Sequence, residues 1–138
     1  MKWLPLLLTL VTCLSCPTLS QAQDLQYPID KVLDECLENT DRMATGCYAE
    51  ALEAWDAELN RVYQELRVIL SPEEKDRLLA AQRAWLAYRD AEFLFTDDFY
   101  QHMQGYYNKQ EASVRRMSLI RERALQLKVY LNDKRANE

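Results

Sequence analysis

The apolar residues between positions 48 and 69 recur at the spacing of an amphipathic helix. Their steps alternate between four and three residues without a miss, as in a helix that buries one stripe. The members of this seam are Tyr48, Leu52, Trp55, Leu59, Val62, Leu66 and Ile69. A second stripe follows at Leu78, Ala81, Trp85 and Tyr88, widened by Leu79, Leu86 and Phe93. The pattern therefore predicts two long amphipathic helices.

Between these stretches stands a strong helix-start signal, Ser71-Pro72-Glu73-Glu74. Ser71 can cap the next helix, Pro72 fits its first position, and Glu74 completes a capping box. Leu70 and Ser71 therefore form a tight corner, and the segment from Cys47 to about Phe95 is predicted to be an antiparallel helical hairpin. Beyond Phe95 the helix can continue, or it can break or kink at Thr96-Asp97-Asp98.

Two further helices flank the hairpin in this prediction. Pro28 starts a short helix, and Gly46 is expected to interrupt helical structure just before Cys47. The segment 104–108 is the expected loop, and a closing helix follows from about Gln110 to Leu131, before a frayed end. Its inward positions are Val114, Met117, Ile120, Ala124, Leu127 and Leu131.

The most specific polar residues lie inside the hairpin. Positions 56, 60 and 63 share one face of the first helix, and positions 82, 85 and 89 share one face of the second. Folding about the corner would set Asn60 near Gln82 and bring Asp56 within reach of Arg89. We call these residues the polar ladder. It is expected at the edge of the seam, where it either fixes the register of the two helices or forms a binding site. Its members are Asp56, Asn60, Tyr63, Gln82, Trp85, Arg89 and Asp90.

The first 22 residues have the form of a secretory signal peptide. Lys2 precedes an apolar run from Leu4 to Leu14, and Ser20 and Ala22 occupy the small-residue positions of a cleavage site. A retained anchor and a lipoprotein signal at Cys13 or Cys16 are the alternatives. The run is short for a membrane span. Residues 23–138 are thus expected to form one helical domain that is periplasmic or secreted, without stable membrane insertion after cleavage.

Cleavage would change the charge and the cysteine count. The loss of Lys2 from 17 basic and 22 acidic residues takes the net charge from −5 to −6, which argues against nucleic-acid binding. The two remaining cysteines, Cys36 and Cys47, are expected to form a disulfide in an exported chain. A metal site is the alternative, but it would need further ligands and the single histidine lies far along the chain. The expected fold class is therefore all-α: an antiparallel helical hairpin, a short disulfide-linked N-terminal helix and a closing C-terminal helix.

The sequence offers no catalytic constellation. The hairpin has no histidine to activate a nucleophile, and the chain has no glycine-rich phosphate loop and no motif with metal-ligand spacing. No enzyme, cofactor or metal is therefore predicted. Tyr100, Tyr106 and Tyr107 could form an exposed aromatic patch for a partner, or could cover the end of the core.

Three segments together resemble the LprI-like lysozyme-inhibitor domain family of small exported bacterial proteins. They are Cys36…Cys47-Tyr48, the stretch from Asp56 to Tyr63, and Ala81-Gln82-Arg83-Ala84-Trp85…Arg89-Asp90-Ala91-Glu92. The match extends to Arg123-Ala124 and Leu127. One departure is Phe93, which stands where this family often has a cysteine that pairs with another in the last helix.

The resemblance implies a non-enzymatic domain that binds a protein of the cell envelope, with lysozyme as the named candidate. Acidic groups would suit the surface of a cationic lysozyme. A structural or stress-related envelope protein that binds another partner or cell-wall fragments is the alternative.

Overall fold

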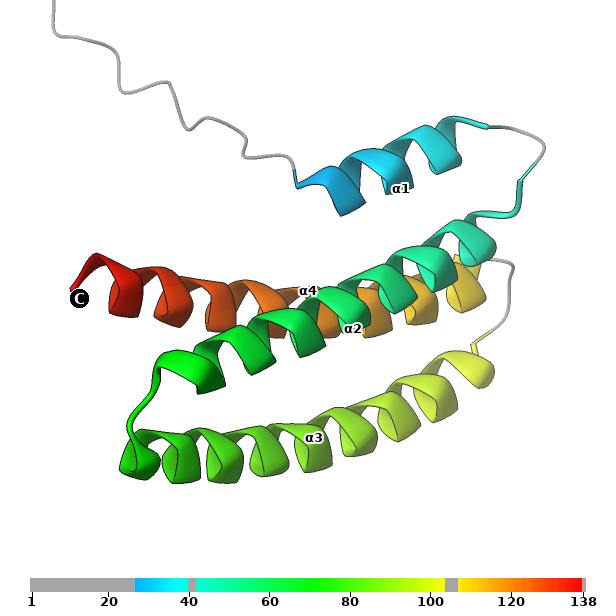
Figure 1. Cartoon of the computed structure of the whole chain (residues 1–138). Helices are drawn as coiled ribbons and strands as arrows, with labels where there is room; N and C mark the ends of the chain where they lie inside the picture. Colours follow the sequence, from blue (N-terminus) through cyan, green and yellow to red (C-terminus); the bar gives the residue numbers. More distant parts are fainter. Residues whose placement is uncertain (1–26, 40–41, 104–106, 138) are drawn as a thin grey trace, which may run out of the picture.

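The computed structural model describes residues 27–39, 42–103 and 107–137, and these residues form four α-helices and no strand. The prediction of an all-α chain is confirmed. The helices are α1 (Pro28–Glu38), α2 (Ala44–Ile69), α3 (Pro72–Gln101) and α4 (Tyr107–Ala136) (Figure 1).

A disulfide fastens α1 to the start of α2. Cys36 and Cys47 are bonded, with their Cα atoms 5.8 Å apart, as the sequence predicted. Closing this short loop stabilises the fold by about 2.5–3 kcal/mol in the chain-entropy model. α2 begins at Ala44, so Gly46 lies inside the first helical turn and does not interrupt the helix.

The predicted corner is confirmed at Ser71. The Ser71 hydroxyl accepts a hydrogen bond from the Glu74 amide at 3.3 Å, and the Ser71 amide donates to the Glu74 carboxylate at 2.8 Å. Lys134 of α4 donates to the same carboxylate at 2.9 Å. The capping box that reverses the chain is therefore also a point of attachment for the last helix.

The core lies between α2 and α4, which make by far the most extensive contact in the fold. These helices run parallel to each other (Figure 1), because Glu58 and Glu65 of α2 meet Lys128 and Arg135 of α4 in the same order. α3 is the antiparallel return that makes this parallel pairing possible. The buried apolar side chains are Leu33, Cys36, Cys47, Ala51, Trp55, Leu59, Val62, Leu66, Met117, Ile120, Ala124, Leu127 and Leu131.

The expectation that the two hairpin arms pack on each other is wrong. α3 makes most of its contacts with α4, and its direct contact with α2 is slight. Gln82 and Thr96 are its buried residues, whereas Ala81 and Tyr88, expected to face inward, are exposed. A heptad stripe identifies the buried face of a helix but not its partner, and here α4 takes the place assigned to α3.

The ends of the last two helices also differ from the prediction. α3 passes through Thr96 without a break and continues to Gln101. α4 is longer than expected, because it includes Asn108 at its start and runs to Ala136 instead of fraying after Leu131. Residues 104–106 of the expected loop lie outside the described residues.

Candidate functional site

The polar ladder does not bridge α2 and α3. The Asn60 side-chain amide donates to the backbone oxygen and carboxylate of Asp56 on its own helix, at 2.9 and 3.1 Å. Arg89 donates to the adjacent Asp90 carboxylate at 2.9 and 2.6 Å. Neither of the two expected bridges, Asn60 to Gln82 or Asp56 to Arg89, forms among the described residues. The reason is that α3 packs on α4 and not along the seam of α2.

Gln82 has a buried partner on α4. Its side-chain oxygen accepts two hydrogen bonds from the Arg123 guanidinium, at 3.1 and 3.0 Å. Arg123 also donates to Gln126 at 2.5 Å and lies 5.7 Å from the centre of the Trp85 ring. Burial lowers the pKa of Arg123, but a guanidinium keeps its proton in a protein. Amide oxygens and an aromatic face thus hold a cation in the α3–α4 interface, and no carboxylate among the described residues pairs with it.

Asp30 joins three helices at the other side of the core. Its carboxylate accepts from the Trp55 indole of α2 at 3.2 Å and from the Arg121 guanidinium of α4 at 2.7–3.1 Å. The hydrogen bonds to Asp30 raise the pKa of Arg121. The guanidinium lies 5.4 Å from the centre of the Trp55 ring and 5.7 Å from that of Tyr27. This contact holds the first turn of α1 on the core, whereas the disulfide at Cys36 holds its end.

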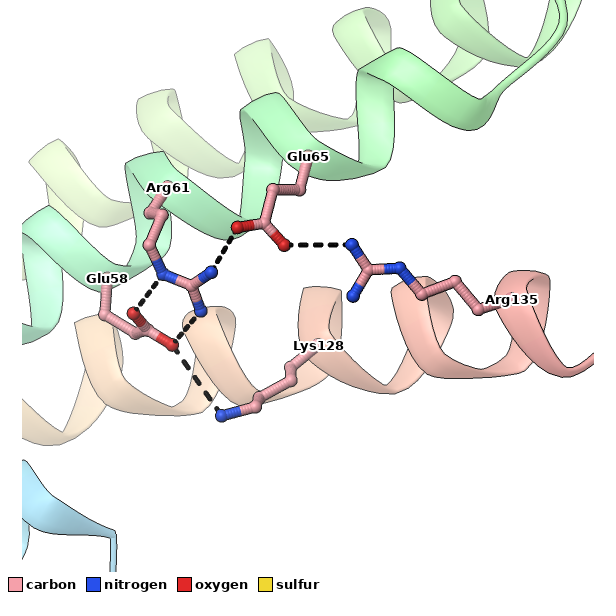
Figure 2. Close-up of polar contacts among 5 residues, drawn as sticks. All are labelled: Glu58, Arg61, Glu65, Lys128 and Arg135. Atoms are coloured by element: carbon pink, nitrogen blue, oxygen red, sulfur yellow. Dashed lines mark hydrogen bonds and ion pairs between the residues drawn. The ribbon is translucent and has the colours of Figure 1, made fainter.

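A chain of alternating charges follows the α2–α4 boundary (Figure 2). Arg61 is held between Glu58, at 2.7 Å, and Glu65. Lys128 lies 3.7 Å from the Glu58 carboxylate, and Arg135 donates to Glu65 at 3.2 Å. Because both acidic groups contact a cation on each helix, the network favours one longitudinal register of α2 against α4.

Two of these contacts predict a loss of stability in acid. Hydrogen bonds from Arg61 lower the pKa of Glu58, aided by the charge of Lys128 and opposed by burial. The Ser71 amide lowers the pKa of Glu74, aided by Lys134. A carboxyl group with a lowered folded-state pKa stabilises the fold above its unfolded pKa of about 4.3, and this contribution disappears as the pH falls through the folded-state value. We expect the melting temperature, followed by circular dichroism, to change little between about pH 5 and 8 and to fall below about pH 4.

The control for this prediction is the double variant Glu58→Gln, Glu74→Gln. It should melt lower than the parent at neutral pH and approach it in acid, because both chains then lack the two charges. An unchanged difference between the two melting curves from pH 7 to pH 3 would show that other carboxylates cause the acid transition.

α4 supplies the cationic partner in most of these contacts. It carries eight basic and three acidic residues, whereas α1, α2 and α3 each carry more acidic than basic residues. The spacing of apolar and polar residues does not predict these cross-helix contacts of α4. The uneven distribution of charge along the chain was the available signal. The contacts that join α4 to the other helices are Arg116–Asp97, Arg121–Asp30, Arg123–Gln82, Lys128–Glu58, Lys134–Glu74 and Arg135–Glu65.

The aromatic candidates are only partly described. Tyr106 lies outside the described residues, and Tyr107 begins α4. Tyr100 is half-buried at the end of α3 and packs edge-on against Phe99, with ring centres 5.1 Å apart. It borders a hollow between α3 and α4 whose lining includes Asp97, Asn108 and Arg116.

The described residues show no cluster of three histidine, cysteine, aspartate or glutamate side chains arranged to hold a metal ion. Within the same segments, no helix combines the length and apolar character required to cross a bilayer.

Comparison with known proteins places this arrangement among relatives. A family model described as "Lysozyme inhibitor LprI" matches residues 36–127. The chain is also similar to an uncharacterised protein from Burkholderia thailandensis of known crystal structure, with 28% sequence identity and a TM-score of 0.75. That similarity covers 80% of this chain and 56% of the other, so this chain spans little more than half of that protein's length. No curated protein matches.

Proposed function

The chain belongs to the LprI lysozyme-inhibitor family, and from this premise we propose that it is an exported, non-enzymatic domain that binds and inhibits lysozyme in the cell envelope. The family match carries the proposal. It extends from Cys36 at the end of α1 to Leu127 in α4, and so covers the disulfide, the hairpin and the Arg116–Asp97 and Arg123–Gln82 contacts.

The distribution of charge supports an electrostatic mode of binding. α1, α2 and α3 each carry more acidic than basic residues, and the excess of basic residues lies in α4. α1 and the first half of α2 carry four exposed glutamates: Glu35, Glu38, Glu50 and Glu53. Acidic side chains at a protein surface attract a cationic enzyme and increase the rate of association more than they strengthen the final contact.

The test is a titration of a cationic lysozyme with the purified domain, measured as the rate of cell-wall lysis. We expect inhibition that weakens as salt is raised, because the Debye length shortens from about 10 Å at 0.1 M to about 3 Å at 1 M. The absence of inhibition at about 50 μM domain, where even a weak specific complex would form, would reject the proposal.

Charge-reversal variants would locate the surface. The triple variant Glu35→Lys, Glu38→Lys, Glu53→Lys should weaken inhibition by about tenfold or more. The matched control is Asp76→Lys, Asp90→Lys, Asp133→Lys, which makes the same change in net charge at exposed positions on α3 and α4. Equal weakening by both variants would assign inhibition to net charge and not to α1 and α2.

A further inference from the structure

The outer face of α3 is exposed and largely apolar. In Figure 1, α3 lies along the lower edge of the molecule and the other helices all lie above it. Large side chains are exposed on it, among them Leu94 at 73%, Phe95 at 61%, Tyr88 at 53% and Phe99 at 49%. Exposed apolar residues scattered singly need no explanation, but a concentration on one helix face indicates an interaction surface.

These residues accompany a regular seam that the core does not use. The exposed positions Arg77, Ala80, Ala84, Ala87, Ala91, Leu94 and Asp98 follow one another in steps of three and four residues. This is the heptad spacing of a helix that packs lengthwise on another helix. Alanine at the central positions allows two helix backbones to approach closely. The seam rises about 32 Å along the axis, enough for six turns of contact.

We propose that this face binds the same face of a second copy of the chain, with the two α3 helices antiparallel about a twofold axis at Ala87. A twofold contact brings the same surface of both copies together, so the seam must complement itself when reversed. Reversal places Ala87 against Ala87, Ala84 against Ala91 and Ala80 against Leu94 of the other copy. A small residue thus faces a large one at each end of the alanine segment.

The charges at the two ends of the seam select this arrangement. In the antiparallel register, Arg77 of each copy faces Asp98 of the other, and the ion pair forms twice. A parallel pair would instead place Arg77 against Arg77 and Asp98 against Asp98, which is repulsive. The Asp98 side chain is 79% exposed; the His102 imidazole of the same helix lies 3.8 Å from its carboxylate, and no ion pair joins Arg77 to another described residue. Both groups are exposed, and their opposite charges at the two ends of the seam specify a second copy in reverse orientation.

Sedimentation equilibrium of the purified chain tests the proposal. We expect a dimer at about 100 μM, and we expect Ala87→Glu to raise the dimer dissociation constant at least about tenfold by placing two carboxylates on the axis. Val68→Glu is the matched control, because Val68 is 78% exposed on α2; it should leave the dimer intact. Circular dichroism checks that both variants stay helical. A monomeric parent chain, or a dimer that persists in Ala87→Glu, would overturn the inference.

A charge exchange tests the register independently. Arg77→Asp and Asp98→Arg should each raise the dissociation constant by about tenfold, and the double variant should return it to near the parent value because the pair is restored with inverted signs. In addition, Ala87→Cys should form an intermolecular disulfide on mild oxidation, whereas Val68→Cys should not. Failure of the double variant to restore the dimer would rule out the Arg77–Asp98 pairing and with it this register. None of these outcomes depends on lysozyme inhibition, so the two proposals stand or fall separately.

Discussion

Replacing Trp55 with alanine is expected to lower the free energy of unfolding by about 3–5 kcal/mol, the range for truncating a fully buried aromatic side chain. Trp55 is 1% exposed and lies in the α2–α4 core. Its ring contacts the edge of Tyr27, with centres 5.6 Å apart, and lies beneath Arg121. Its indole also donates to Asp30, so the substitution opens a cavity and removes a donor from the junction of α1, α2 and α4. Chemical denaturation followed by circular dichroism measures the change.

Two further variants separate the parts of this effect. Trp55→Phe keeps most of the ring volume but removes the N–H donor, and should cost about 1–2 kcal/mol. Val68→Ala, on the exposed side of the same helix, should change stability by less than about 0.5 kcal/mol. If Trp55→Ala cost no more than Trp55→Phe, the ring would not be packed as the structure places it.

The sequence predicted the individual helices better than their pairing. The α2 seam, the Ser71 corner and the Cys36–Cys47 bridge depend on local spacing or on chemistry that needs no third partner, and all three are present. The choice of α4 over α3 as the partner of α2 depends on packing across about 70 residues of chain. Periodicity along one helix carries no information on this choice, which is why it predicts Ala81 and Tyr88 to face the core although both lie on the surface.

The polar ladder shows the same difference between single residues, which the sequence identifies, and the pairing of helices, which it does not. The sequence singled out Gln82 and Trp85, and both residues contact a buried group. The predicted partner is wrong, because pairing positions across the Ser71 corner leaves α4 out. The excess of basic residues in α4 over α1, α2 and α3 was visible in the sequence and would have indicated that the last helix is the shared electrostatic partner.

Replacing Gln82 with leucine is expected to destabilise the fold by about 3–4 kcal/mol, although leucine is apolar and similar in size. The reason is Arg123, which is 9% exposed and cannot release its proton. The substitution removes the oxygen that accepts two of its hydrogen bonds and leaves a buried cation with Gln126 as its remaining described acceptor. Removing one partner of a buried charged contact costs more than the contact contributes, because the other partner keeps its desolvation penalty. Urea denaturation of the parent and the variant measures the difference.

The double variant Gln82→Leu, Arg123→Leu decides whether this explanation holds. Because both polar groups are then gone, we expect it to recover most of the lost stability, and the coupling energy of the double-mutant cycle should be about 2 kcal/mol or more. Gln82→Glu, which supplies a carboxylate to the same guanidinium, should be close to the parent in stability at neutral pH.

Lysozyme inhibition by these chains then distinguishes the two roles that the sequence left open for Gln82, a structural role in helix register and a role in a binding site. If Gln82→Leu keeps its stability but loses inhibition, the residue belongs to a binding site. If it loses stability and the double variant regains both stability and inhibition, Gln82 fixes the register of α3 on α4.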